Sequence, residues 1–201
     1  MQSRYSESDA RTFIERYARE GEDLALRVYT SRLLGQDPTL VLHGGGNTSV
    51  KSRARELTGE SVDVLYVKGS GWDLGNIAPA GFPACRLDPL RHRCQLHAFL
   101  PQKFVDHTHA SAVLTVVDQP DGAERAREVW GDGLLVVPYV MPGFVLAKRI
   151  VELEAELAKA EVMVLDKHGI FTWGSSARES YERMIAAVDR AEAYVKKNAR
   201  V

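Results

Sequence analysis

Three histidines have a sequence setting that suits metal binding. His107 and His109 flank one threonine in a stretch, residues 104–117, that is rich in β-branched and apolar residues and is predicted as a strand. Side chains two residues apart on a strand point the same way, so these imidazoles could hold one metal ion. His168 stands next to Gly169, in a tight turn predicted between two short strands. The alternative is that His107 and His109 are ordinary half-exposed strand residues, since His-x-His often occurs by chance.

A glycine-rich run has the composition of an anion-binding loop. Residues 43–49 read His-Gly-Gly-Gly-Asn-Thr-Ser. Glycines allow several backbone N–H groups to face one point, and such a nest binds phosphate above all. The polar residues at 47–49 add side-chain donors. No Gly-Lys-Ser/Thr follows, so the run is not a Walker loop. The same residues also fit a plain turn between two strands.

A second turn of this kind follows a predicted strand. Residues 68–73 read Lys-Gly-Ser-Gly-Trp-Asp. This run lacks the third glycine of a dinucleotide fingerprint, and the prolines and glycine at 79–83 work against the long helix that should follow. We therefore interpret it as an anion-contacting turn with Ser70 and Gly71 as donors. The alternative is a surface turn with a buried Trp72.

One tyrosine is a candidate proton donor. Tyr139 lies between Pro138 and the Pro-Gly pair at 142–143, where a turn could bring its hydroxyl to a site. Tyr194 falls in a predicted helix, where packing is the more typical role for a tyrosine.

The elements that would position these residues alternate between helical and strand patterns, which is typical of the α/β class. Apolar periodicity predicts helices at 8–34, with a possible break at Gly21, at 123–130, at 144–160 and from Ser176 onward. Strands are predicted at 39–43, 62–67, 104–117, 134–137, 162–165 and 170–173. Residues 75–89 are predicted as mostly loop.

Composition excludes several classes of protein. The chain has 201 residues, 45% apolar and 26% charged, with a formal charge of −1. We expect one domain over 1–201, without nucleic-acid binding, because there is no basic excess. No apolar run approaches the ~18 residues of a membrane span, and the N-terminus does not resemble a secretory signal. A cytoplasmic protein with Cys85 and Cys94 reduced is the expectation; one disulfide is the alternative.

Five short motifs occur in the order seen in the class II aldolase/adducin family. They are Gly-Asn-Thr-Ser at 46–49, Lys-Gly-Ser-Gly at 68–71, His-Thr-His at 107–109, Pro-Tyr at 138–139 and Lys-His-Gly at 167–169. The runs at 42–51 and 104–110 resemble one branch more closely, the aldolase module of bifunctional rhamnulose-1-phosphate aldolase/alcohol dehydrogenases. The resemblance covers about residues 23–194. It does not extend to a nicotinamide-binding domain.

The resemblance implies a three-layer αβα fold around a mostly antiparallel sheet, and a homotetramer with sites at subunit interfaces. It implies Zn²⁺ on His107, His109 and His168. It implies a substrate phosphate held by Gly46, Asn47, Ser49, Ser70 and Gly71. It further implies that Tyr139 serves the aldehyde end of the substrate.

The implied reaction is reversible cleavage of a ketose 1-phosphate, such as rhamnulose 1-phosphate, to dihydroxyacetone phosphate and an aldehyde. The family's base is a glutamate shortly before the His-x-His strand, and the sequence has Arg93 at that place, in a segment that is shorter than in relatives. Asp88, His92 and His97 are the nearest replacements. A non-catalytic, adducin-like domain is therefore one alternative, and a zinc dehydratase or epimerase is another.

Overall fold

The computed structural model describes residues 1–88, 96–141 and 143–199. Its strands form a seven-stranded sheet in the order β3-β2-β1-β4-β7-β6-β5. Each neighbouring pair is antiparallel except β5 and β6, which are parallel. The strands are β1 (Asn47–Arg55), β2 (Ser61–Val67), β3 (Ala84–Arg86), β4 (Phe104–Thr108), β5 (Leu134–Val137), β6 (Val162–Leu165) and β7 (Gly169–Gly174).

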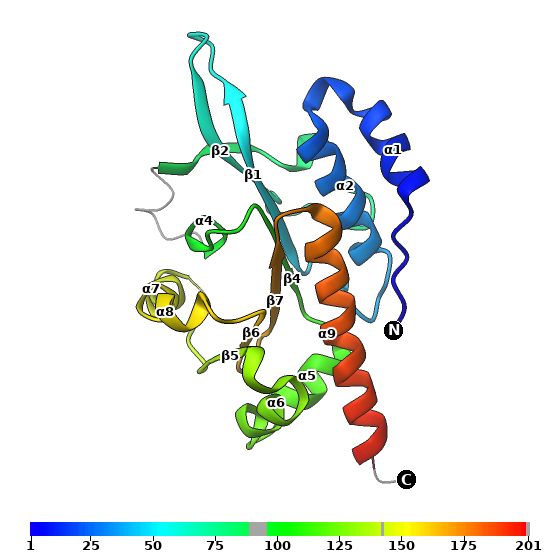
Figure 1. The fold of residues 1–201 in the computed structure, drawn as a ribbon, viewed down its shortest axis with the longest axis vertical. Coiled ribbons are helices and arrows are strands. Elements are labelled where there is room, and N and C mark those ends of the chain that lie inside the picture. Colours follow the sequence, from blue (N-terminus) through cyan, green and yellow to red (C-terminus); the bar gives the residue numbers. More distant parts are fainter. Residues whose placement is uncertain (89–95, 142, 200–201) are drawn as a thin grey trace.

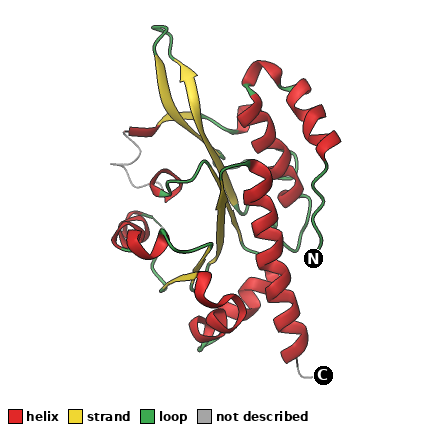
Figure 2. Ribbon diagram, in the orientation of Figure 1, coloured by secondary structure: helices red, strands yellow, loops and turns green. Residues whose placement is uncertain are grey.

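Helices cover both faces of this sheet (Figure 1; Figure 2). α1, α2 and α9 lie on one side of it, and α4, α7 and α8 lie on the other. α5 and α6 pack with α9. The helices are α1 (Glu7–Arg16), α2 (Glu22–Gly35), α4 (Leu96–Phe99), α5 (Ser111–Val117), α6 (Gly122–Trp130), α7 (Phe144–Glu152), α8 (Glu154–Leu157) and α9 (Ala177–Asn198). The three-layer α/β architecture with a mostly antiparallel sheet is confirmed.

The two largest apolar clusters lie on opposite faces of the sheet and hold the layers together. Val162 and Val164 of β6 belong to the cluster that includes α2, α5 and α9. Met163 and Leu165, which alternate with them, belong to the cluster that includes Leu146 of α7. Both faces of β6 are therefore buried, because successive side chains of a strand point to opposite faces.

Several predicted boundaries are confirmed. The predicted N-terminal helix is divided before Gly21: α1 ends at Arg16, a 3-10 turn follows over Ala18–Glu20, and Gly21, with φ 88°, separates this turn from α2. Ser176 caps α9, accepting a hydrogen bond from the backbone N–H of Glu179.

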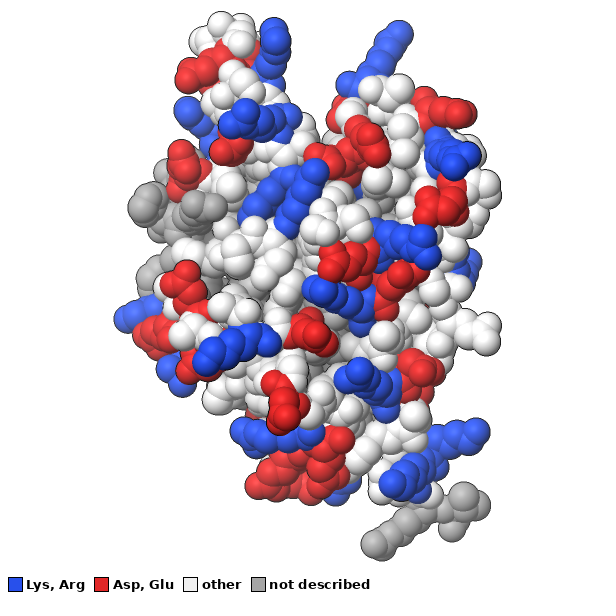
Figure 3. Space-filling model, viewed as in Figure 1, with Lys and Arg blue, Asp and Glu red and all other residues white. Residues whose placement is uncertain are grey.

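Among the described residues, no helix is long and apolar enough to cross a membrane. On the face shown in Figure 3, acidic and basic side chains are intermixed. Some of the charged side chains of the molecule form ion pairs, such as Arg178 with Glu7 and Glu182.

Two predicted strands are wrong in whole or in part. Residues 39–43 form turns and irregular loop instead of a strand, although Leu40 and Val41 are buried. The predicted strand at 104–117 ends at Thr108, and α5 takes over from Ser111. Val113, Val116 and Val117 are buried at i, i+3 and i+4, which is the spacing of a helix face and overrides their β propensity.

The predicted helix at 144–160 is interrupted. α7 ends at Glu152, and α8 begins at Glu154. Leu153 between them has φ −101° and ψ 21°, outside the helical region, although its N–H still bonds the carbonyl of Ile150. Leu146, Ile150 and Leu157 still face one cluster, so the break preserves the apolar face that the sequence predicts.

Candidate metal centre

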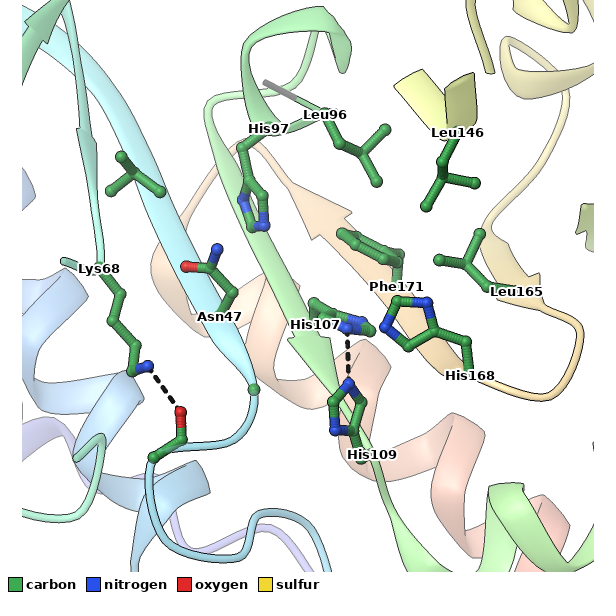
Figure 4. A pocket seen from close by; sticks show the side chains of 13 residues that line it. Asn47, Lys68, Leu96, His97, His107, His109, Leu146, Leu165, His168 and Phe171 are labelled. Atoms are coloured by element: carbon green, nitrogen blue, oxygen red, sulfur yellow. Dashed lines mark hydrogen bonds between the residues drawn. The ribbon is translucent and has the colours of Figure 1, made fainter. Parts of the chain in front are cut away.

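The three predicted metal ligands converge at one end of the sheet. His107 lies in β4, His109 follows the end of that strand, and His168 lies in the turn between β6 and β7. One ring nitrogen from each of the three lies within 4.8 Å of the others. The Nε2 atoms of His107 and His109 are 3.0 Å apart, and Figure 4 shows the three rings facing one another.

The surroundings of the rings favour the neutral form that binds a metal. Nδ1 of His107 lies 3.0 Å from the carbonyl oxygen of Ile170. A carbonyl only accepts, so Nδ1 carries the proton and Nε2 presents its lone pair to the cluster. Burial lowers the pKa of His107 well below its usual value, and the neighbouring His109 and His168 lower it further. Burial also lowers the pKa of His109 and of His168. The donor set of three neutral imidazoles suits a divalent transition metal such as zinc.

Gly169 allows the turn to approach the two histidines of β4. A Cβ at this position would lie 2.5 Å from the carbonyl oxygen of Thr108 and 3.0 Å from ring carbons of both His107 and His109. Its φ of 158° is also one that residues with side chains rarely adopt. The glycine therefore sets the distance between His168 and the other two rings.

We expect Gly169→Ala to weaken zinc binding about 10–100-fold, as the loss of a ligand-orienting contact typically does. The added methyl group must push the turn away from Thr108, and His168 moves with it. Zinc affinity measured against a competing chelator checks this. Gly133→Ala is the matched control, because a Cβ there would meet nothing closer than 3.6 Å. Equal affinities for the two variants would contradict the assigned role.

The histidine cluster forms one wall of a cleft of about 400 Å³. Gly44, Gly46, Asn47 and Lys68 lie along the cleft with the histidines, and Figure 4 shows Asn47 between Lys68 and His97. Nζ of Lys68 donates a hydrogen bond of 2.9 Å to the carbonyl of Gly44. Burial lowers the pKa of Lys68, and Asp73 partly offsets that effect.

The other predicted phosphate ligands are placed differently. Gly46 and Asn47 line the cleft, whereas Ser49 is fully buried beneath it. Its hydroxyl hydrogen-bonds Nδ1 of His97 over 2.8 Å, so it supports a histidine instead of lining the cleft. Ser70 and Gly71 are exposed and are not among the residues that line the cleft.

Of Tyr139 and the candidate bases that the structure describes, one lines the cleft. Tyr139 is 55% exposed and does not line the cleft. Asp88 is exposed and does not line it either. His92 and Arg93, like Cys94, lie outside the described residues. Only His97 of the three candidates is shown to line the cleft.

Lys68 was missing from the predicted site, although the sequence held a signal for it. It begins the same turn motif as Ser70, directly after the last residue of β2. A residue that directly follows a strand lies where the strands of the sheet end, and in this protein the cleft lies there. Sequence spacing favoured the serine and glycine of the motif, and the backbone turns those two outward.

A buried ion pair lies under the centre. Arg27 of α2 and Asp106 of β4 are both fully buried, with Nη2 and Oδ1 2.6 Å apart. Arg27 also donates to the carbonyls of Ser49 and Val105, and Ser180 of α9 donates to Asp106. The pair thus ties α2, β1, β4 and α9 together one residue before His107.

A three-layer α/β domain with a histidine cluster at the end of its central strands belongs to the class II aldolase type, and solved structures agree. The N-terminal class II aldolase domain of a conserved protein from Thermoplasma acidophilum is 34% identical, with a TM-score of 0.81 over 97% of this chain and 99% of that one. The sequence model described as Class II Aldolase and Adducin N-terminal domain matches residues 25–195. The chain belongs to this family.

More distant structures share the fold. L-fuculose-1-phosphate aldolase from Thermus thermophilus is 17% identical, with a TM-score of 0.59 over 86% of this chain and 95% of that one.

A longer sequence relative also matches. YuxG of Bacillus subtilis (strain 168), described as an uncharacterized oxidoreductase, is 34% identical over 211 residues. That alignment covers 90% of this chain and 31% of YuxG, so the chain spans about a third of that relative. The alignment is also longer than the 201 residues of this chain, so YuxG has residues within it that lack a counterpart here.

Proposed function

We propose that the chain is a zinc-dependent aldolase that cleaves a ketose 1-phosphate, such as rhamnulose 1-phosphate, to dihydroxyacetone phosphate and an aldehyde. One observation carries the proposal. Three neutral imidazoles converge in a cleft that also holds a glycine loop and a lysine. Such a cleft suits a ligand with a phosphate at one end and metal-binding oxygens at the other. The sugar-phosphate aldolases among the structural relatives support the same substrate class.

The residues at the phosphate end have the right chemistry. Lys68 supplies a positive charge, Asn47 a side-chain amide, and Gly46 a backbone turn with φ 67°. These three are central to the proposed phosphate site. Ser70 and Gly71 belong to the same turn as Lys68 but do not line the cleft, so their proposed part is to shape the turn that carries Lys68, and Ser49 would act through His97.

The proposed role of the three clustered histidines is to bind the metal ion. His107, His109 and His168 would bind zinc, which supplies Lewis-acid stabilisation of the charge that develops when the carbon–carbon bond breaks. Ile170 and Phe171 fix the ring of His107, the first by its carbonyl and the second by stacking at 4.1 Å between ring centroids. A ring held in this way keeps Nε2 pointed into the cluster.

A non-catalytic, adducin-like binding domain is the second candidate. None of the described residues that line the cleft is acidic. A positioned base typically contributes about 10²–10⁴ in rate, so a chain without one would bind substrate and turn it over slowly. The presence of all three histidines of the proposed metal site favours the aldolase.

An assay of zinc-loaded protein with rhamnulose 1-phosphate and fuculose 1-phosphate tests the proposal. We expect release of dihydroxyacetone phosphate, which a coupled dehydrogenase detects, and loss of that release after chelation. Binding of either sugar phosphate without any turnover would favour the adducin-like candidate. A dehydrated or epimerised product would assign the chain to another branch of the superfamily.

Replacing Lys68 tests the phosphate end. We expect Lys68→Ala to raise KM for the sugar phosphate about 10–100-fold, since a charge-assisted contact contributes about 1.5–3 kcal/mol. The kcat should change less, because the phosphate is remote from the reacting bond. Lys103→Ala is the control: its Nζ pairs with Asp23 at 2.7 Å, and it does not line the cleft. A KM unchanged in Lys68→Ala would place the phosphate elsewhere.

The remaining proposals concern the assembly. We propose one domain over 1–201, a homotetramer and a cytoplasmic location. In such a tetramer, the exposed Tyr139 would contribute to the aldehyde end of a neighbouring subunit's site. Any further activity of a longer protein of which the chain forms part, such as the oxidoreductase activity in the description of YuxG, would reside outside these residues.

A further inference from the structure

The short helix α4 holds His97 against the sheet through contacts with β1. Nζ of Lys51 donates hydrogen bonds to the carbonyls of His97, Leu100 and Gln102, over 3.1, 2.5 and 2.7 Å. These carbonyls lie within and just after α4, where a cation is favoured. Lys51 therefore fixes the position of the helix, and with it the backbone of His97.

The ring of His97 is also fixed, but one of its two nitrogens lacks a hydrogen-bond partner among the described residues. Nδ1 is hydrogen-bonded to the hydroxyl of Ser49 over 2.8 Å. The ring centroid lies 5.6 Å from that of Phe171, which in turn stacks on His107. The residue is 5% exposed, and Nε2 has no hydrogen-bond partner among the described residues. Figure 4 shows the ring reaching into the cleft beside Asn47, whose Oδ1 is likewise buried and, within the described part of the chain, unpartnered.

The surroundings of His97 define what can pair with it. Burial, together with the charges of Lys51 and Arg27, lowers its pKa to about 3, so the imidazole is neutral near pH 7. So weak a base is poorly matched to proton abstraction from carbon at neutral pH. With Nδ1 engaged by Ser49, Nε2 is a donor in one tautomer and an acceptor in the other. A hydroxyl group satisfies either, whereas a phosphate would be drawn to Lys68.

We propose that His97 binds a hydroxyl group of the triose half of the substrate through Nε2, with Ser49 as the positioning residue that fixes its ring. The inference rests on the proposed function. The triose half is chosen because it carries the phosphate. Lys68, Asn47 and His97 line the same cleft, and Figure 4 shows Asn47 between the other two, so a ligand held at Lys68 by its phosphate would extend its carbon chain past Asn47 toward His97.

Calorimetric titration of the zinc-loaded protein with dihydroxyacetone phosphate tests this. His97→Phe keeps a ring that can contact Phe171 but removes both nitrogens, and we expect it to raise Kd about tenfold. His97→Gln places an amide near the position of Nε2, and we expect it to recover most of that loss. Ser49→Ala should weaken binding a few-fold by freeing the ring. Ser52→Ala, a serine of the same strand that donates to Asp23 and does not line the cleft, should bind as the original protein does.

The outcomes separate the two proposals. Each variant is first shown to retain its zinc stoichiometry and its melting temperature, so that affinity reports on the ligand contact. Equal Kd values for the original protein and His97→Phe would overturn the inference and leave the proposed function intact. Equal losses in His97→Phe and His97→Gln would also overturn it, because shape and not hydrogen bonding would then matter. Failure of the original protein to bind dihydroxyacetone phosphate would overturn the proposed function and this inference with it.

Discussion

Replacement of His107 by alanine is expected to remove about 3 kcal/mol of zinc-binding free energy, which corresponds to a loss of affinity on the order of a hundredfold or more. Apparent zinc-binding free energies of about 10–16 kcal/mol are shared among four ligands in structural sites, so each ligand contributes several kcal/mol. His107 is the best fixed of the three ligands here, because it is 6% exposed, stacked on Phe171 and bonded to Ile170. Mass-spectrometric metal content after gel filtration should fall from about one zinc per chain to a small fraction. Aldolase turnover should disappear with it.

His97→Gln is the matched control for this experiment. It changes another buried histidine that lines the same cleft but is absent from the converging set. We expect it to retain one zinc per chain. If His107→Ala bound zinc as tightly as His97→Gln, the metal would have to be held by other residues, and the cluster would lose its assigned role. If neither the original chain nor its variants held a divalent metal after zinc addition, the adducin-like binding domain would become the favoured function.

The fold was predictable where local signals agree with the final environment. β6 and β7 are short apolar runs in the interior of the sheet, and the N-cap of α9 is the one that Ser176 and Glu179 predict. The prediction was wrong where the same composition is compatible with a strand and with a helix. Residues 111–117 are rich in valine, yet their buried positions follow a helical spacing. β1 was not predicted, because most of its residues are polar and it is stabilised by pairing with β2 and β4.

The site was predictable to the extent that motifs carry it. The order of five motifs led to the three histidines, and the structure brings these together. Spacing along the chain, however, does not tell which side of a turn faces the cleft. Lys68 faces it, Ser70 does not, and Ser49 lies one layer below. His97 could be singled out as a titratable residue, but its neutral state depends on burial, which only the packed fold provides.

The second large expected effect concerns stability. Arg27→Met is expected to lower the free energy of unfolding by about 3–5 kcal/mol, because it leaves the carboxylate of Asp106 buried without its countercharge. Both side chains are fully buried, and their charged atoms are 2.6 Å apart. Burial lowers the pKa of Arg27, and the attraction of Asp106 partly offsets this. The change also removes donors to the carbonyls of Ser49 and Val105. Urea denaturation measures the loss.

Two further variants distinguish a missing countercharge from a missing side chain. Arg53→Met removes a partner from the exposed pair with Asp63, whose side chains are 76% and 63% exposed, and should cost less than about 1 kcal/mol. Arg27→Met combined with Asp106→Leu removes both buried charges, and should recover much of the stability lost by Arg27→Met alone. If Arg27→Met were as mild as Arg53→Met, the buried pair could not be what ties α2 to β4. If the double variant recovered stability but bound zinc more weakly, the pair would be needed to align β4 for its histidines, and its presence under the metal centre would have a functional reason.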